Sequence, residues 1–307
     1  MYFTRRVFSM LVTLWIIVTL TFLIMHSIPG DPFSTDAKAL PEDVLENMRE
    51  KYNLDKPLPL QYVLYIKNLL LLDFGPSIQS NRDVNTMIAT GFGASAILGL
   101  QSLVLSIILG IGLGGLAALY HHRFLDFLSM LIAIIGISVP SFILAPLLIK
   151  YAAVEWGLLP VASWGTWQHT ILPTIALTVG PVAIIARFVR ASMIEVLNQN
   201  YIRTAEAKGL SDFQVVLRHG LRNGLIPVIT FIGPLFASLI TGTFVIEKIF
   251  AIPGIGKYFV DSIFNRDYPV ILGTTIFYSI ILIITLFLID LSYRFIDPRI
   301  KLSSRED

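Results

Sequence analysis

Long apolar runs separated by short charged segments dominate this chain. One run without a formal charge extends from Phe8 to Ile28, and five more cover about 92–119, 126–150, 171–189, 225–246 and 271–293. A helix needs about 20 apolar residues to cross a hydrocarbon core of roughly 30 Å. The pattern predicts an all-α integral membrane protein with six transmembrane helices. The first is expected to be a retained signal anchor, because its apolar run is too long for a signal peptide and no cleavage site follows it.

The lysines and arginines predict the orientation of these helices. Outside the long loop 29–91, thirteen of them flank one side of the predicted helices and four flank the other. The thirteen are Arg5, Arg6, Arg123, Arg187, Arg190, Arg203, Lys208, Arg218, Arg222, Arg294, Arg299, Lys301 and Arg305, and the four are Lys150, Lys248, Lys257 and Arg266. Because cytoplasmic flanks carry the excess of positive charge, both termini are predicted to be cytoplasmic.

The long external loop between the first two predicted helices has helical patterns of its own. The segment PEDVLENMREKYNL begins with a proline and two acids, which are typical of a helix N-terminus. The segment PLPLQYVLYIKNLLLL predicts an amphipathic or surface-lying helix. We therefore divide the chain into the anchor helix with a folded external loop at 1–91, a transmembrane core at 92–296 and a cytoplasmic tail at 297–307.

Composition excludes several classes of function. Of the 307 residues, 55% are hydrophobic and 14% are charged, and the small net charge of +2 does not indicate nucleic-acid binding. The absence of cysteine excludes disulfides, thiolate metal sites and cysteine catalysis.

The least hydrophobic long segment of the second half is YIRTAEAKGLSDFQVVLRHGLRN, at 201–223. Ser192 and Glu195 upstream have the spacing of a capping box, from which a helical run is expected to reach Lys208. Gly209 is expected to end this run in the left-handed conformation. Ser211 and Gln214 repeat the capping spacing and open a second helix. Its predicted apolar stripe consists of Phe213, Val216, Leu217, Gly220 and Leu221, with Arg218 and Arg222 off it.

The pattern leaves the role of this predicted helix-turn-helix open. A surface helix resting on lipid headgroups and a docking surface for a cytoplasmic partner fit it about equally well. A DNA-reading element fits poorly, because its recognition helix would be held between two membrane spans.

The loop nevertheless resembles a known family. AEAKG and RHGLRNGLIP are similar to the cytoplasmic EAA loop of binding-protein-dependent ABC importer permeases, specifically the first permease subunit (oligopeptide permease B type) of the oligopeptide, dipeptide and nickel group. Segments at 136–148, 157–173, 186–210, 245–273 and 297–299 carry the resemblance in order along the chain. Arg203, Thr204 and Arg222 depart from the general loop consensus in the manner of peptide permeases, whereas Ala205, Gly209 and Pro227 match it.

The resemblance implies a type I ABC importer permease fold in a bacterial cell membrane. The implied cargo is oligopeptides, with dipeptides, glutathione or nickel as alternatives. The implied partners are a homologous second permease subunit, two ABC ATPase subunits, an external peptide-binding protein and the lipid bilayer, with no nucleic acid. The implied coupling loop spans about 190–224. It comprises a contact segment of Tyr201, Arg203, Thr204, Ala205, Glu206, Ala207, Lys208, Gly209 and Leu210, and a supporting helix with Ser211, Phe213, Arg218 and Arg222.

The chain lacks a recognisable energy source of its own. No G-x-x-x-x-G-K-[ST] phosphate loop occurs, and the nearest segment, AIPGIGKYF, has Ala251 and Tyr258 at two required positions. We interpret Pro253, Gly254 and Gly256 within it as an outer turn. No cofactor is expected on this chain, and ATP and Mg²⁺ are expected on the partner ATPase subunits.

A stand-alone secondary transporter is the main rival, and a membrane enzyme is a more distant one. Ion-coupled transport usually needs ionisable residues at mid-membrane depth. The candidates all fall near the ends of the predicted spans, and they are Lys150, Arg187, Glu247 and Asp290.

No catalytic or metal site is predicted. The five histidines are scattered, and the His121–His122 pair has only Asp126 as a nearby acid, so it is assigned to a loop. Bends are expected at Pro140, Pro181 and Pro234, and close helix packing at the G-x-x-x-G pair Gly110 and Gly114. The candidate pathway or gate residues are Ser138, Pro140, Ser141, Ser238, Thr241 and Thr243.

Overall fold

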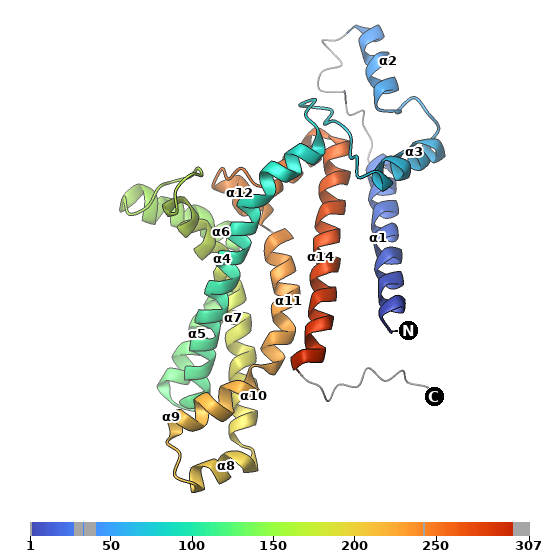
Figure 1. Ribbon diagram of the computed structural model, residues 1–307. Coiled ribbons are helices and arrows are strands. Elements are labelled where there is room, and N and C mark those ends of the chain that lie inside the picture. Colours follow the sequence, from blue (N-terminus) through green and yellow to red (C-terminus); the bar gives the residue numbers. More distant parts are fainter. Residues whose placement is uncertain (1, 28–32, 34–40, 242, 297–307) are drawn as a thin grey trace. The chain divides into compact units, whose positions relative to one another are not determined.

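The computed structural model describes residues 2–27, 33, 41–241 and 243–296 (Figure 1). Within these residues the secondary structure is helical, apart from one isolated bridge between Pro76 and Asp83. In this described part of the chain, five helices are long and apolar enough to cross a membrane, and a bent pair of helices makes a sixth if it counts as one span. The prediction of an all-α membrane protein is confirmed.

The described helices follow one another along the chain. Their bounds are α1 Tyr2–Ser27, α2 Glu42–Lys51, α3 Leu58–Leu70, α4 Val84–Leu119, α5 Phe124–Ser138, α6 Ser141–Leu148, η1 Ile149–Glu155, α7 Gln168–Leu197, α8 Asn200–Ala207, α9 Asp212–Val215, η2 Val216–Leu221, α10 Arg222–Gly224, α11 Ile226–Thr241, α12 Phe244–Ile249, α13 Ile255–Asn265 and α14 Tyr268–Ile296. The two η segments are π-helical.

The chain forms two compact units. Unit 1 consists of Met1–Gly93 and Gly254–Ile283, and unit 2 consists of Ala94–Pro253 and Ile284–Asp307. The division into 1–91, 92–296 and 297–307 stays a prediction.

In unit 1, both predicted helices of the external loop form. Helix α2 follows Pro41 and carries Glu42 and Asp43 in its first turn and Arg49 and Lys51 in its last, so its charges complement the helix dipole.

Helix α3 follows the second proline-rich segment and packs against α1. The hydroxyls of Tyr62 and Thr19 lie 2.6 Å apart, and His26 Nε2 lies 3.0 Å from Gln61 Oε1. The ring of Phe22 meets the Tyr62 ring edge-on. Helix α3 is therefore held against α1 by side chains of both helices.

The turn between α13 and α14 is tied to the loop that precedes α4. The Asp267 carboxylate is 3% exposed and accepts hydrogen bonds from Ser77 Oγ and from the backbone amides of Ile78, at 3.0 Å, and Gln79, at 3.3 Å. These donors offset the desolvation of the buried carboxylate.

Unit 2 is built around α7, which supplies many of the core residues. Its contact with α4 depends on two glycines. A Cβ at Gly110 would lie 2.6 Å from Ile185 Cβ, and a Cβ at Gly114 would lie 2.4 Å from the carbonyl oxygen of Ala186. The predicted close packing at the G-x-x-x-G pair is therefore confirmed, and α7 is the partner helix.

The predicted bend at Pro140 is confirmed, and it divides the span predicted at 126–150 into two helices. Helix α5 ends at Ser138, α6 begins at Ser141, and the two are bent by 96°. Pro140 has no amide hydrogen to continue the helix and favours an extended conformation at Val139, whose φ and ψ are −96° and 110°. By contrast, α7 and α11 continue through Pro181 and Pro234.

Candidate functional site

The predicted coupling loop begins where α7 ends. Figure 1 shows α8 and α9 beyond the end of α7, with α10 leading into α11. Gly209 has φ +86°, a left-handed conformation that favours glycine, as the sequence predicted. The amide of Leu210 donates to the carbonyl oxygen of Ala205 at 3.3 Å and so closes the end of α8.

The loop has an apolar core of its own. Ile202, Ala205 and Val215 are buried together, and Leu197 and Leu210 pack against them. This core joins α8 to α9 and to the last residue of α7.

The capping box at the start of α9 is confirmed. The amide of Ser211 donates to Gln214 Oε1 at 3.3 Å, and the amide of Gln214 donates to Ser211 Oγ at 3.4 Å. These two bonds satisfy amides that the first turn of a helix leaves unpaired.

Two local predictions in this segment are wrong. Ser192 and Glu195 lie inside α7 and do not cap a helix, and the helix does not run unbroken to Lys208 because α7 ends at Leu197. In the second helix, Val216 and Gly220 of the predicted stripe are buried and Leu221 is half-buried, and Val215 is buried as well. This helix becomes π-helical from Val216, which the sequence pattern did not predict.

Similarly, the predicted outer turn is shorter than expected. Residues 250–254 form the turn, whereas Gly256 lies inside α13.

Most of the contact segment of α8 is open to solvent. Tyr201 Oη accepts a hydrogen bond from Asn223 Nδ2 at 3.0 Å, which links α8 to α10. Among the predicted contact residues, Ala205 is buried, Leu210 is half-buried, and the exposed ones are Tyr201, Arg203, Thr204, Ala207, Lys208 and Gly209. The side chains of Glu206, Phe213, Arg218 and Arg222 lie outside the described part of the structure. The exposed side chains of Arg203 and Lys208 make the described part of this surface positively charged.

A cavity of about 270 Å³ in unit 2 brings together three of the six predicted pathway residues. Pro140 and Ser141 lie at the bend between α5 and α6, and Ser238 faces them from α11. The lining residues that the sequence did not single out for the pathway come mainly from α5, α7 and α11, and include Gly136, Ala176, Leu177, Gly180, Leu235 and Leu239.

Two other predicted pathway residues, Ser138 and Thr243, are not among the described residues that line this cavity. Ser138 is exposed, and its hydroxyl donates to the carbonyl oxygen of Ile134 at 2.7 Å. Thr243 is buried and donates to the carboxylate of Glu247 within α12. The side chain of Thr241 lies outside the described residues.

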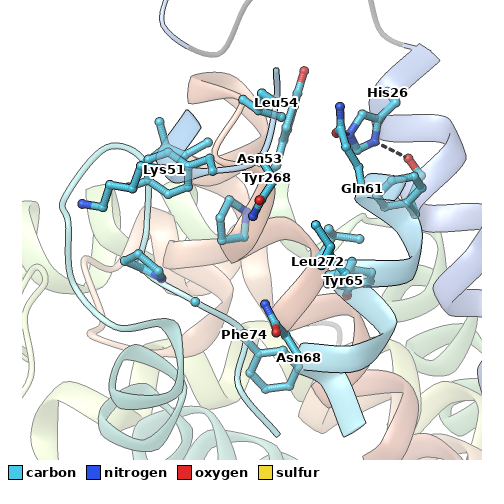
Figure 2. A pocket seen from close by; sticks show the side chains of 17 residues that line it. His26, Lys51, Asn53, Leu54, Gln61, Tyr65, Asn68, Phe74, Tyr268 and Leu272 are labelled. Carbon is cyan, nitrogen blue, oxygen red and sulfur yellow. Dashed lines mark hydrogen bonds between the residues drawn. The ribbon is translucent and has the colours of Figure 1, made fainter. Parts of the chain in front are cut away.

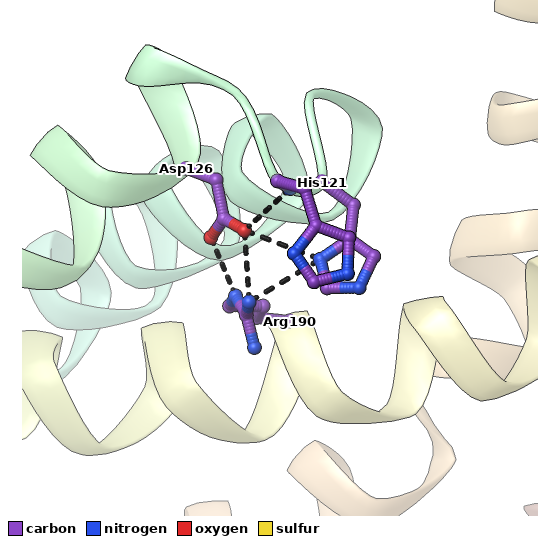
Figure 3. Close-up of polar contacts among 4 residues, drawn as sticks. His121, Asp126 and Arg190 are labelled. Atoms are coloured by element: carbon purple, nitrogen blue, oxygen red, sulfur yellow. Dashed lines mark hydrogen bonds and ion pairs between the residues drawn. The ribbon is translucent and has the colours of Figure 1, made fainter.

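Sequence reasoning missed one charged cluster in unit 2 (Figure 3). Asp126, at the start of α5, accepts hydrogen bonds from Arg190 of α7, with Nε at 2.6 Å from Oδ1 and Nη2 at 2.8 Å from Oδ2. His121 Nδ1 lies 3.2 Å from Oδ2, and the amide of His122 donates to the same oxygen at 3.1 Å. No sequence pattern could pair residues that are 64 positions apart.

A smaller cavity of about 150 Å³ lies in unit 1 (Figure 2). His26 and Gln61 are hydrogen-bonded at its edge, and Tyr65, Asn68 and Leu272 line it. Burial raises the pKa of the Tyr65 phenol above its usual value.

The pKa of the nearby Tyr52 phenol is also raised, first by burial and then by the negative charge of Asp267. Among the described residues of the whole chain, no group of three histidine or acidic side chains is arranged to hold a metal ion.

The sequence matches two families along its length. Residues 106–302 match the family described as binding-protein-dependent transport system inner membrane component, and residues 1–95 match the N-terminal family of such membrane components.

Related proteins match the chain over nearly its full length. The dipeptide transport system permease protein DppB of Bacillus subtilis is 54% identical over 99% of this chain and 99% of its own length. The oligopeptide transport system permease protein OppB of Haemophilus influenzae is 43% identical over 97% of this chain and 98% of its own length.

Solved structures have the same fold. A chain of the MetNI methionine ABC transporter in an inward-facing conformation superposes with a TM-score of 0.57 at 19% identity, covering 69% of this chain and 96% of that chain. A chain of an amino acid ABC transporter with histidines has a TM-score of 0.55 at 12% identity, over 68% of this chain and 94% of its own. With these matches and its helical architecture, the chain belongs to the family of binding-protein-dependent transport system inner membrane components and has the type I ABC importer permease fold.

Proposed function

We propose that this chain is one of two permease subunits of an ATP-driven importer of short peptides, and that α8 is its contact with an ATPase subunit. Family membership supports the importer role. The relatives named as dipeptide and oligopeptide permeases support peptide cargo, and they support both peptide lengths equally.

One observation carries the coupling assignment, namely an exposed basic surface on a loop that has its own core. Arg203 and Lys208 are exposed, while Ile202 and Ala205 are buried against Val215. Because the segment is packed around its own core, it moves as a rigid unit. A displacement imposed by a bound subunit is therefore transmitted to α7 and does not deform the loop.

The energy source is assigned to the partners. Since the chain contains no phosphate-loop sequence, ATP and Mg²⁺ belong to separate ATPase subunits. ATP binding draws the coupling loops of the two permease subunits together and opens the pathway outward. An external binding protein then delivers the peptide, and hydrolysis resets the inward-open state. Import in this direction, from outside the cell to the cytoplasm, requires the coupling loop and both termini to lie on the cytoplasmic side of a bacterial cell membrane.

The 270 Å³ cavity is proposed as part of the peptide pathway. The hydroxyls of Ser141 and Ser238 offer hydrogen bonds to a peptide backbone, and the bend at Pro140 places one of them on the cavity wall.

The test is purification of the tagged chain in mild detergent, with the partners identified and ATP hydrolysis measured with and without peptide-loaded binding protein. We expect a second permease and two ATPase subunits, with hydrolysis stimulated by peptide. Lys208→Glu is expected to weaken recovery of the ATPase subunits or to abolish uptake, whereas Lys67→Glu, on the exposed surface of α3, is expected to do neither.

Two outcomes would overturn parts of this proposal. Recovery of this chain alone, with gradient-driven transport that is indifferent to ATP, would favour a secondary transporter. Normal assembly and uptake with Lys208→Glu and with Gly209→Pro would show that another surface couples the subunits.

A further inference from the structure

The Asp126 carboxylate is held more completely than a solvent-exposed turn requires. It is 5% exposed and receives four contacts, two of them from the planar fork of Arg190 (Figure 3). A two-pronged guanidinium–carboxylate contact fixes orientation as well as distance. The start of α5 is therefore fixed to one position on α7.

Farther along, the same two helices pack closely through small residues. Ala133 of α5 is buried with Ala183 and Ala186 of α7. A Cβ at Gly136 would lie 3.0 Å from Val179 Cγ1 and 3.2 Å from the Val179 carbonyl oxygen. Helices that approach this closely cannot slide without collision, so the contact is fixed at both ends of α5.

Helix α7 connects the coupling loop to the cavity, and α5 lines the same cavity. Helix α7 ends at Leu197, three residues before α8 begins, and about 15 Å from Arg190 in the other direction it reaches Gly180 at the cavity wall. Helix α5 reaches the same cavity at Gly136, just before the bend at Pro140.

We propose that Asp126 and Arg190 are positioning residues that lock α5 to α7, so that displacement of the coupling loop moves two walls of the cavity as one body. The inference rests on the proposed function, because it assigns a route for the motion that the coupling loop delivers. Without the lock, α7 moves and α5 lags, and ATP is hydrolysed with less transport.

A purely structural role for the ion pair predicts a different result. It would lower the amount of folded protein, but the complexes that form would transport normally. The ratio of peptide uptake to ATP hydrolysis in assembled complexes therefore separates the two roles.

The experiment uses the whole importer in proteoliposomes with peptide-loaded binding protein. Asp126→Asn keeps the shape of the side chain and removes its charge. We expect the ATPase subunits to remain bound and the ratio of uptake to hydrolysis to fall roughly 2- to 30-fold, the range for residues that carry coupling. Glu155→Gln is the control, because Glu155 is an exposed acid of the same unit whose contact with Lys150 is 3.9 Å long.

A distance measurement provides a second readout. The chain has no cysteine, so spin labels attach only to cysteines that are introduced. We place them by Phe127→Cys on α5 and Ala191→Cys on α7, which are both exposed positions. With Asp126 intact, we expect the same narrow distance distribution in the nucleotide-free and ATP-trapped states. In Asp126→Asn the distribution is expected to broaden when ATP binds.

Unchanged coupling and unchanged distances in Asp126→Asn would overturn the lock. If Asp126→Asn does not assemble, Arg190→Lys, which keeps the charge and loses the two-pronged contact, is judged by the same two readouts. A complex with Asp126 intact that shows no ATP-driven uptake would refute the proposed function itself, which is a distinguishable result.

Discussion

The close contact between α4 and α7 predicts a large difference between two neighbouring glycines. In Gly114→Ala the new Cβ would lie 2.4 Å from the Ala186 carbonyl oxygen and 2.7 Å from Val189 Cβ. Neither atom is the flexible end of a side chain, so the helices must separate. In Gly112→Ala, on the same helix, the new Cβ would meet nothing within 4 Å.

The cost follows from the distances. Non-bonded carbon atoms prefer about 3.5–4.0 Å, so a contact at 2.7 Å requires a local separation of about 1 Å, which forfeits up to about half of the attraction of each neighbouring pair. Overpacking of this kind costs about 1–3 kcal/mol. Lipid tails are as apolar as the helix surfaces, so no hydrophobic gain on contact offsets the loss. Gly112→Ala is expected to stay within about 0.5 kcal/mol of the parent chain.

Thermal and denaturant unfolding of the purified chain in one detergent provide the assay. We expect a clearly lower midpoint for Gly114→Ala than for Gly112→Ala, with Gly110→Ala also lowered because Ile185 Cβ would lie 2.6 Å away. Equal midpoints for Gly112→Ala and Gly114→Ala would refute the reasoning, because the two differ chiefly in the contact with α7.

Three further predictions concern the turns and the external loop. Gly209→Ala is expected to destabilise the coupling loop by about 1–2 kcal/mol through its backbone conformation alone, since no atom lies within 4 Å of the new Cβ. The rate at which a protease cleaves the loop measures this effect. Gly209→Asn is expected to have a smaller effect, because asparagine tolerates the left-handed conformation better. Asp267→Asn replaces a buried acceptor of three hydrogen bonds and is expected to lower the free energy of unfolding by about 1–3 kcal/mol. The amide of Ile78 is then expected to exchange its hydrogen faster, and an unchanged exchange rate would contradict the prediction. The pKa of the Tyr65 phenol is raised in the folded protein, so its contribution to stability is complete below the ordinary phenol pKa of about 10. That contribution is lost as the pH rises through the pKa of the folded state. An absorbance titration is expected to show a phenol that ionises above the ordinary pKa and that is missing in Tyr65→Phe.

The features that the sequence predicted correctly are local ones. The apolar runs become helices because a backbone in lipid must satisfy its hydrogen bonds within its own segment. Pro41 with two acids starts α2, and Gly209 with the Ser211–Gln214 pair ends one helix and begins the next. Each of these signals acts over a few residues, so the sequence alone is sufficient to predict where these helices begin and end.

The coupling loop shows where a linear reading fails. The capping at Ser211 and Gln214 was predicted, but the π-helical segment from Val216 to Leu221 was not, because the apolar spacing there was interpreted as an α-helix. The interruption after Leu197 was also missed, since a capping pattern inside a helix looks the same in sequence as one at its start.

Tertiary structure alone decided which distant residues meet. Three of the six predicted pathway residues share the cavity, because the 96° bend at Pro140 determines which side chains face α7 and α11. The pairing of Asp126 with Arg190 spans 64 positions and has no trace in local pattern. Local patterns fix hydrogen bonding within a helix, whereas contacts between helices depend on bend angles and side-chain shapes that are defined only when all the segments are packed together.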